Sequence, residues 1–250
     1  MKRSAGAAAA LAAGLVLAGC GSSPLETLPT CTSGAVSLTL EQASNAATIA
    51  AVGKRVGMPN HAVTVALATA FQESKLRNLD YGDRDSLGLF QQRPSQGWGT
   101  SAQVQDPVYA AQAFYAHLRR VPGWRTLPVT VAAQKVQRSG APSAYAQWEE
   151  ASRQLARALT GELPAALACQ FTPMPRPSGP IGVEQQARIE LGPGGLARAA
   201  SVAQTWSTAS WLVAQASSYG ISTVSVAGRT WTAKRGTWKA DAGAHALVWS

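Results

Sequence analysis

The length of 250 residues allows one or two domains. The three histidines are isolated and form no metal-ligand spacing with a cysteine, so we expect neither a metal nor another cofactor. The formal net charge of +9 favours an anionic partner, and for an exported chain we expect lipid or cell-wall polymer rather than nucleic acid.

The first 19 residues predict a secretory signal peptide. Lys2 and Arg3 precede an apolar run, rich in Ala and Leu, that ends in Leu17-Ala18-Gly19-Cys20. A basic start, a short apolar stretch and small residues at its end are typical of a cleaved signal and not of a membrane-spanning helix. Its removal takes away two positive charges, so the net charge falls from +9 to +7.

The end of this run resembles a bacterial lipobox, in which the cysteine becomes the acylated first residue of the mature protein. The resemblance implies a lipid anchor on Cys20 and a location at the outer face of the cytoplasmic membrane, facing the cell wall. Residues 20–36 would then form a tether, because the stretch directly after Cys20 is rich in small residues. The alternative is an ordinary signal peptide with a chance cysteine.

The remaining cysteines, Cys31 and Cys169, predict one disulfide, because an even pair in an exported protein is typical of such a bond. The bond would tie together the two ends of the central region. In the chain-entropy model, closing so long a loop contributes about 4 to 5 kcal/mol. Two free thiols are the alternative.

The central region begins with two predicted helices. Thr39-Leu-Glu-Gln42 has the spacing of a capping box, and the apolar pattern that follows continues to Val56. A second apolar helical pattern begins near Asn60 and runs toward Glu73.

The segment from Phe71 to Trp98 has the residue types of a catalytic cleft. It places Glu73 at the end of an apolar helix, then a carboxylate-rich loop, then a strand-like step at residues 88–91. This arrangement sets one acid among polar groups that can hold a sugar. Trp98 lies between two glycines, and we expect it to stack on a sugar ring. Within the loop, we expect Asp80 and Asp85 to pair with Arg77 or Arg84.

Three more helices are predicted in the central region. Asp106-Pro107 is a helix start, because proline suits the first helical position, and this helix runs to about Arg120. The others span residues 130–138 and 142–159. Four prolines between positions 173 and 180 then predict a semi-rigid linker at residues 170–183.

Residues 184–250 predict a small helix-plus-antiparallel-sheet module. A helical pattern spans residues 196–218, and short strand patterns lie at 222–226, 229–232, 236–239 and 245–249. Five of the eight tryptophans fall here; Trp231 and Trp238 lie beside basic residues, where they would bind a wall polymer or a protein partner. The alternative is a core filled with tryptophan. The expected fold class is α+β, mainly α.

The central motifs resemble those of a known superfamily. Glu73-Ser74, followed fifteen positions after the Glu by Gly88-Leu89-Phe90-Gln91, resembles the Glu-Ser and Gly-Leu-Met-Gln motifs of soluble lytic transglycosylases. Residues 81–84, Tyr-Gly-Asp-Arg, resemble a Trp-Gly-Asp-Arg step of goose-type lysozymes. The resemblance covers roughly residues 38–159. It implies a lysozyme-like domain at residues 37–169, peptidoglycan glycan strands as the substrate, and Glu73 as the general acid.

The resemblance also implies roles for four other residues of the segment. Ser74 would orient the Glu73 carboxyl group by a hydrogen bond. Gly88 and Gln91 would line the cleft, with Gln91 binding polar groups of the sugar. Asp83 would position an attacking water, or else would only form a turn beside Gly82.

Two positions depart from the motifs. Residues 137–140, Gln-Arg-Ser-Gly, stand where lytic transglycosylases have a Tyr-Asn pair, and we expect Tyr145 in the next helix to replace that tyrosine. Arg93 stands near the place of the second goose-type aspartate.

Four functions are considered for these residues. The leading hypothesis is a lytic transglycosylase, in which Glu73 acts as acid and then as base. A muramidase, in which Asp83 positions water, is the alternative reaction. Two readings from other classes are a non-catalytic wall-binding lipoprotein and a lipoprotein that serves a transporter.

Overall fold

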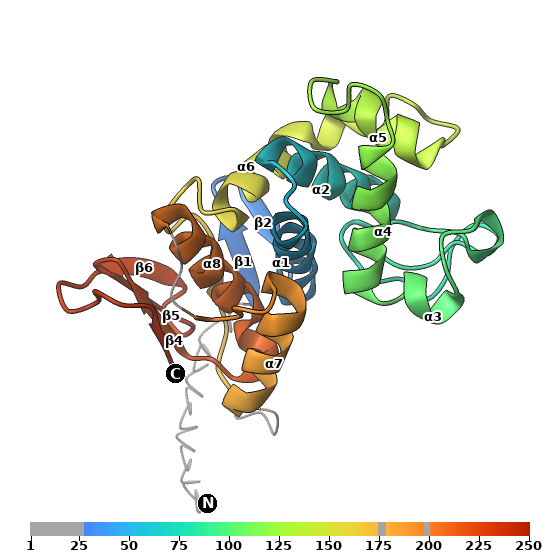
Figure 1. Cartoon of the computed structure of the whole chain (residues 1–250). Helices are drawn as coiled ribbons and strands as arrows, with labels where there is room; N and C mark the ends of the chain where they lie inside the picture. Colours follow the sequence, from blue (N-terminus) through green and yellow to red (C-terminus); the bar gives the residue numbers. More distant parts are fainter. Residues whose placement is uncertain (1–27, 175–178, 198–200) are drawn as a thin grey trace, which may run out of the picture.

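The computed structural model describes residues 28–174, 179–197 and 201–250 (Figure 1). The predicted signal peptide, Cys20 and the first part of the predicted tether lie outside the described residues. No helix in the described ranges is both long and apolar enough to cross a membrane. The fold class is α+β and mainly α, which confirms the prediction.

The described residues of the central region form six α-helices, two of which begin at the capping residues predicted from the sequence. They are α1 (Leu40–Arg55), α2 (Asn60–Ser74), α3 (Ser101–Val104), α4 (Pro107–Arg119), α5 (Val129–Gln137) and α6 (Glu149–Leu159). Before α1, the Thr39 hydroxyl accepts from the Gln42 amide at 3.2 Å, and the Gln42 side chain accepts from the Thr39 amide at 2.8 Å. Before α4, Asp106 accepts from the Val108 amide at 2.9 Å. These side chains satisfy backbone donors that a helix start leaves unpaired.

Two parts of this region differ from the prediction. α6 begins at Glu149 and not near Pro142, because the preceding residues form turns and a short 3-10 helix, η2 (Ala146–Trp148). The short helix α3 and the 3-10 helix η1 (Pro94–Gln96) were not predicted.

A three-stranded antiparallel sheet joins the two ends of the central region. Its strands are β1 (Thr30–Ser33), β2 (Val36–Leu38) and β3 (Ala168–Gln170), in the order β2-β1-β3. Cys31 lies opposite Cys169 in this sheet, and the two form a disulfide, which confirms the predicted bond. β1 lies within the segment expected to be a tether, so the folded part begins earlier than predicted.

The C-terminal residues form two helices and a second sheet. α7 (Gly179–Leu191) and α8 (Val202–Tyr219) precede β4 (Thr223–Val226), β5 (Arg229–Thr232), β6 (Thr237–Ala240) and β7 (Val248–Trp249). The strands are antiparallel in the order β6-β5-β4-β7. α7 begins inside the segment predicted as a linker, of which residues 175–178 lie outside the described ranges.

These C-terminal elements are packed onto the central region and do not stand apart from it. α7 and α8 lie along α1, α8 also contacts α6, and buried residues of all four helices belong to one hydrophobic core. Figure 1 shows α7, α8 and the second sheet on one side of α1, with α3, α4 and α5 on the other side. The molecule therefore has one continuous core, in which α1 is central.

The C-terminal tryptophans belong to this packing. Trp231 is fully buried, and its Nε1 donates to the Cys169 carbonyl at 3.0 Å. Trp238 is half-buried, and its Nε1 donates to the Leu167 carbonyl at 2.8 Å. Both indoles therefore hold the second sheet against the disulfide-bonded strands. Trp231 therefore fits the alternative of a tryptophan-filled core, whereas Trp238 keeps part of its side chain exposed.

Candidate functional site

Glu73 lies in the last turn of α2, where the buried helix meets the surface. The helix ends because Lys75 and Leu76 both have left-handed backbones, with φ of 56° and 59°. The amides of these two residues donate to the carbonyls of Phe71 and Ala70, as in a typical helix C-terminus. Glu73 itself is half-buried, so its carboxyl group is held by the helix end and yet reaches solvent.

Tyr145 is the hydrogen-bond partner of this carboxyl group. Its hydroxyl donates to Oε1 of Glu73 at 2.8 Å, across 72 residues of sequence. Burial, followed by the Glu73 carboxylate, raises the pKa of Tyr145 far above its ordinary value, whereas a hydrogen bond with Ser139 acts in the opposite direction. Because the hydroxyl keeps its proton, it acts as a neutral donor to Glu73.

Residues 88–91 form a tight turn and not the strand-like step that we predicted. Leu87 and Gln92 exchange backbone hydrogen bonds of 3.1 and 3.0 Å around it. Gly88 has a φ of 76°, and a Cβ at this position would lie 2.2 Å from the Val104 carbonyl oxygen. Gln91 also has a positive φ, of 48°. Left-handed residues at both ends reverse the chain, which an extended strand cannot do.

The turn is fixed by side chains from two helix ends. The buried hydroxyl of Ser74, at the end of α2, donates to the Leu89 carbonyl at 2.8 Å. Nε2 of Gln137, at the end of α5, donates to the Phe90 carbonyl at 2.8 Å. The expected hydrogen bond from Ser74 to the Glu73 carboxyl group is replaced by this contact, so Ser74 positions the turn and not the acid.

Gln91 is held inside the loop that precedes the turn. Its Nε2 donates to the carbonyls of Tyr81 at 3.2 Å and Gly88 at 3.3 Å. A Cβ on Gly82 would lie 2.0 Å from Gln91 Oε1, so only glycine leaves room for this side chain. The predicted motif residues Gly82, Gly88 and Gln91 are therefore brought together by backbone packing.

Two of the three aspartates of the loop, Asp83 and Asp85, have different surroundings. Asp83 is exposed, and within the described residues neither a hydrogen bond nor an ion pair joins it to Glu73. Asp85 accepts from the Ser95 amide at 2.7 Å and pairs with Arg93 at 2.8 Å. These contacts, that of Ser95 first, hold the pKa of Asp85 well below its usual range. The expected pairing of Asp85 with Arg77 or Arg84 is wrong, because Arg93 is the partner.

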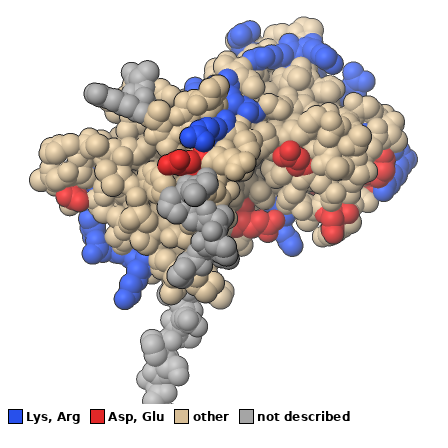
Figure 2. Space-filling model, turned by 60° about the horizontal axis from the view of Figure 1, so that its bottom comes forward, with Lys and Arg blue, Asp and Glu red and all other residues tan. Residues whose placement is uncertain are grey.

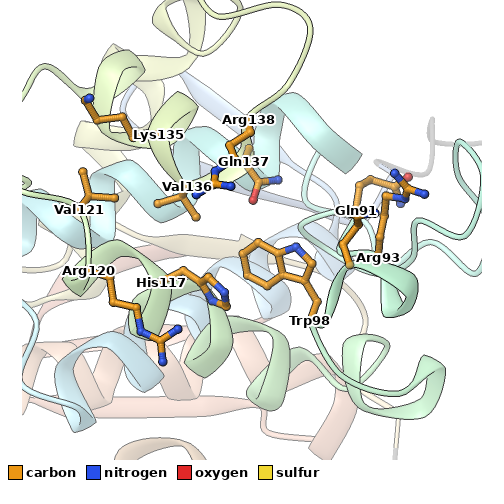
Figure 3. A pocket seen from close by; sticks show the side chains of 11 residues that line it. Gln91, Arg93, Trp98, His117, Arg120, Val121, Lys135, Val136, Gln137 and Arg138 are labelled. Carbon is orange, nitrogen blue, oxygen red and sulfur yellow. The ribbon is translucent and has the colours of Figure 1, made fainter.

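Trp98 faces a cavity beside the turn. Its ring packs against His117, with centroids 4.0 Å apart, and both side chains line a cavity of about 500 Å³ (Figure 3). Gln91 and Gln137 line the same cavity. The cavity therefore shares two residues with the structure around Glu73.

Trp148 supports the end of α2, although the motifs gave it no role in the site. Its ring stacks on Phe71, with centroids 5.1 Å apart and planes 4° apart, and Lys75 Nζ lies 4.2 Å from the ring centroid. Its Nε1 donates to Oε1 of Gln72 at 2.9 Å. In the sequence, the position of Trp148 three residues after Tyr145 is the feature that could have indicated this role.

The described residues contain no group of three or more His, Cys, Asp or Glu side chains placed to hold a metal ion. Comparison of the sequence with models of known protein families, and with curated proteins, gives no match. The function of the site is therefore argued from its geometry and chemistry.

Proposed function

We propose that the protein cleaves the glycan strands of peptidoglycan as a lytic transglycosylase, with Glu73 as the general acid. The hydrogen bond from Tyr145 to Glu73 is the observation that carries this proposal. It places a neutral donor on one oxygen of a half-buried carboxyl group, beside a tight turn and a cavity that is large enough for a sugar-sized ligand.

The proposed reaction uses one carboxyl group twice. Glu73 first gives its proton to the oxygen that links two sugars, and the bond from this oxygen to the anomeric carbon breaks. The Tyr145 hydroxyl engages Oε1, which leaves Oε2 for proton transfer and stabilises the carboxylate that forms. The carboxylate then takes the proton from the substrate's own C6 hydroxyl as this oxygen bonds to the anomeric carbon. The products are a free 4-hydroxyl end and an anhydro sugar.

Hydrolysis by the same acid would need a second carboxylate to hold water. Asp83 is the residue that would fill this role, and in inverting enzymes such a carboxylate lies about 6.5 to 9.5 Å from the acid, with the water between them. Mass spectrometry of the products separates the two reactions. Anhydro ends support the proposal, whereas reducing ends that disappear in Asp83→Asn indicate a muramidase.

The variant Glu73→Gln tests the proposal directly. We expect it to lower the release of soluble muropeptides from purified peptidoglycan at least about 100-fold, because the amide cannot act as a general acid. Glu150→Gln, at an exposed position in α6, is the matched control and should retain full activity. Circular dichroism and thermal unfolding should show the same fold for both variants.

Two outcomes would overturn the proposal. Activity retained by Glu73→Gln would remove this residue from the mechanism. Sedimentation with insoluble wall, with no soluble product from the native protein, would instead indicate a non-catalytic wall-binding protein.

A further inference from the structure

The cavity beside the Glu73 site is strongly basic. Its lining contains no carboxylate and combines four cationic side chains with two aromatic rings: Arg93, Arg120, Lys135, Arg138, Trp98 and His117. Figure 3 shows them arriving from the loop after the turn, from α4 and from α5, with the Trp98 indole in the middle. In Figure 2, the Lys and Arg side chains gather in groups on the face shown, whereas the acidic ones are scattered.

Three of the four cations have no acidic partner. Arg93 is paired with Asp85, but Arg120, Lys135 and Arg138 form no ion pair with any carboxylate of the described residues. All three are exposed at the cavity. Like charges that converge on one cavity repel one another, and an anion bound there would relieve this repulsion.

Helix ends account for only part of this arrangement. Arg120 and Arg138 are the C-cap residues of α4 and α5, and Lys135 lies in the last turn of α5, where cations offset the helix dipole. That role requires neither a cavity nor an aromatic ring. The convergence of both helix ends on the space around Trp98 is what indicates a ligand.

A buried acceptor lines the same cavity. Gln137 donates through Nε2 to the Phe90 carbonyl, while its Oε1 is buried without a hydrogen-bond partner. A buried acceptor left unpaired costs free energy, so a ligand with an N–H group would be favoured here. The cavity thus offers cations for carboxylates and one acceptor for an amide.

We propose that this cavity binds the stem peptide of the peptidoglycan strand that Glu73 cleaves. Arg120, Lys135 and Arg138 would pair with the peptide carboxylates, and Gln137 Oε1 would accept from a peptide N–H. Because Gln91 and Gln137 border both the cavity and the turn beside Glu73, a peptide carried on the bound strand can reach it. This inference rests on the proposed function, since it deepens the substrate assignment of the same site. A phosphate-rich wall polymer offers anions but no amide N–H, so it fits the lining less well.

Two forms of one substrate test this proposal. Glycan strands with free stem-peptide carboxylates are compared with the same strands after those carboxylates are amidated. Amidation removes the negative charges and preserves the size of the peptide. For the native full chain, we expect amidation to raise KM about tenfold with little change in kcat, an effect of the size that two or three exposed ion pairs can give. The effect should shrink at high salt.

The variant Arg120→Gln/Lys135→Gln removes two of the three unpaired cations and should cut the discrimination from about tenfold to about twofold. The matched control is Arg229→Gln/Lys239→Gln, which removes two exposed cations from β5 and β6 and should discriminate like the native protein. Thermal unfolding of both double variants checks their folding. Equal KM values for the native protein on both substrates, or the full discrimination retained by Arg120→Gln/Lys135→Gln, would overturn the proposal.

A binding measurement separates this inference from the proposed function. The Kd of an isolated muramyl peptide, with free or amidated carboxylates, needs no turnover and is measured by calorimetry on the native protein and both double variants. If no strand is cleaved but amidation still weakens binding mainly where Arg120 and Lys135 are present, the proposed reaction fails and the peptide site stands. If a poly(glycerol phosphate) chain binds more tightly than the muramyl peptide, the assignment to a stem peptide is overturned.

Discussion

Two glutamates at helix ends, Glu73 and Glu190, have opposite surroundings. Glu190, in the last turn of α7, is only 2% exposed and has three donors. Its Oε1 accepts from Thr48 at 3.0 Å and Gln186 at 2.6 Å, and its Oε2 accepts from Trp211 at 2.7 Å. Glu73 is half-buried, and among the described residues it has one side-chain donor, Tyr145, at 2.8 Å.

The difference shows what distinguishes a structural carboxyl group from a reactive one. Both oxygens of Glu190 are engaged by groups from α1, α7 and α8, so this side chain fastens α7 to the core. Glu73 keeps Oε2 without a protein donor in the described residues. If burial were the criterion, Glu190 would be taken as the functional acid. If the criterion is a carboxyl oxygen that is left for a ligand, Glu73 is the functional acid.

The largest expected effect on stability comes from Glu190→Ala. This change leaves two buried donors, Thr48 and Trp211, and the half-buried Gln186 without their acceptor, and it creates a cavity. We therefore expect the free energy of unfolding to fall by about 3 kcal/mol. Chemical denaturation of the full chain measures it. The specific activity of the folded fraction should not change.

Glu184→Ala is the matched control for this prediction. Glu184 lies on the same helix, and its side chain is 52% exposed in an ion pair with Arg188 of 3.9 Å. Its loss should change the free energy of unfolding by less than about 0.5 kcal/mol. Equal losses in the two variants would mean that the buried hydrogen bonds of Glu190 do not hold α7.

A smaller effect, on activity and not on stability, is expected for Tyr145→Phe. The change removes the hydroxyl that donates to Glu73, while the ring still fills the buried space. We expect kcat for muropeptide release to fall about tenfold, the loss of one hydrogen bond to a charged group.

Tyr115→Phe is the control, because its buried hydroxyl donates to the Ile49 carbonyl at 3.0 Å, away from Glu73. This variant should lose about 1 kcal/mol of stability and keep its kcat. Unchanged kcat in Tyr145→Phe would show that Glu73 does not depend on its one donor.

The sequence predicts the helix that carries Glu73 and several of its neighbours. Local signals suffice for its neighbours α1 and α4, because the Thr39 capping box and the Asp106-Pro107 start act within one helical turn. The paired cysteines likewise predict a bond that the structure contains. The positions of α1, α2 and α4 therefore follow from nearby residues.

The contacts that shape the site do not follow from local signals. The turn at residues 88–91 depends on a left-handed Gln91, a conformation that is uncommon for a residue other than glycine. The Ser74 hydroxyl bonds to a carbonyl fifteen residues away, in preference to the adjacent carboxyl group. The backbone conformation of Gln91 and the hydrogen bond of Ser74 both depend on how the turn packs, and the spacing of residues in the sequence does not predict this packing.

The contacts of Glu190 also do not follow from the sequence. Gly179 and Pro180 at the start of α7 are typical of a linker, so the helix was not predicted. The partners of Glu190 on the other helices, Thr48 and Trp211, lie 142 and 21 residues away in sequence. The three donors of this buried carboxyl group could therefore not be predicted before the fold was known.

The smallest expected effect is a pH dependence of stability that belongs to Glu190. Burial raises its pKa above the ordinary value of 4.5, although the hydrogen bonds from Gln186, Trp211 and Thr48 act in the opposite direction. Below about pH 4.5 the side chain is protonated in both the folded and the unfolded chain, so its contribution is fully present. As pH rises, the unfolded chain loses this proton first, and stability falls until the pH exceeds the folded-state pKa.

The variant Glu190→Gln cannot titrate at this position, so it isolates the effect. From about pH 4.5 upward, the free energy of unfolding of the native chain should fall relative to that of Glu190→Gln, by less than the limit of about 1.4 kcal/mol per pH unit for one proton. Urea denaturation of both proteins at matched pH values measures the difference. If the free energies of unfolding of the two proteins change in parallel with pH, the folded chain binds no extra proton at Glu190. The three donors would then hold Glu190 as a charged carboxylate to the same extent as in the unfolded chain.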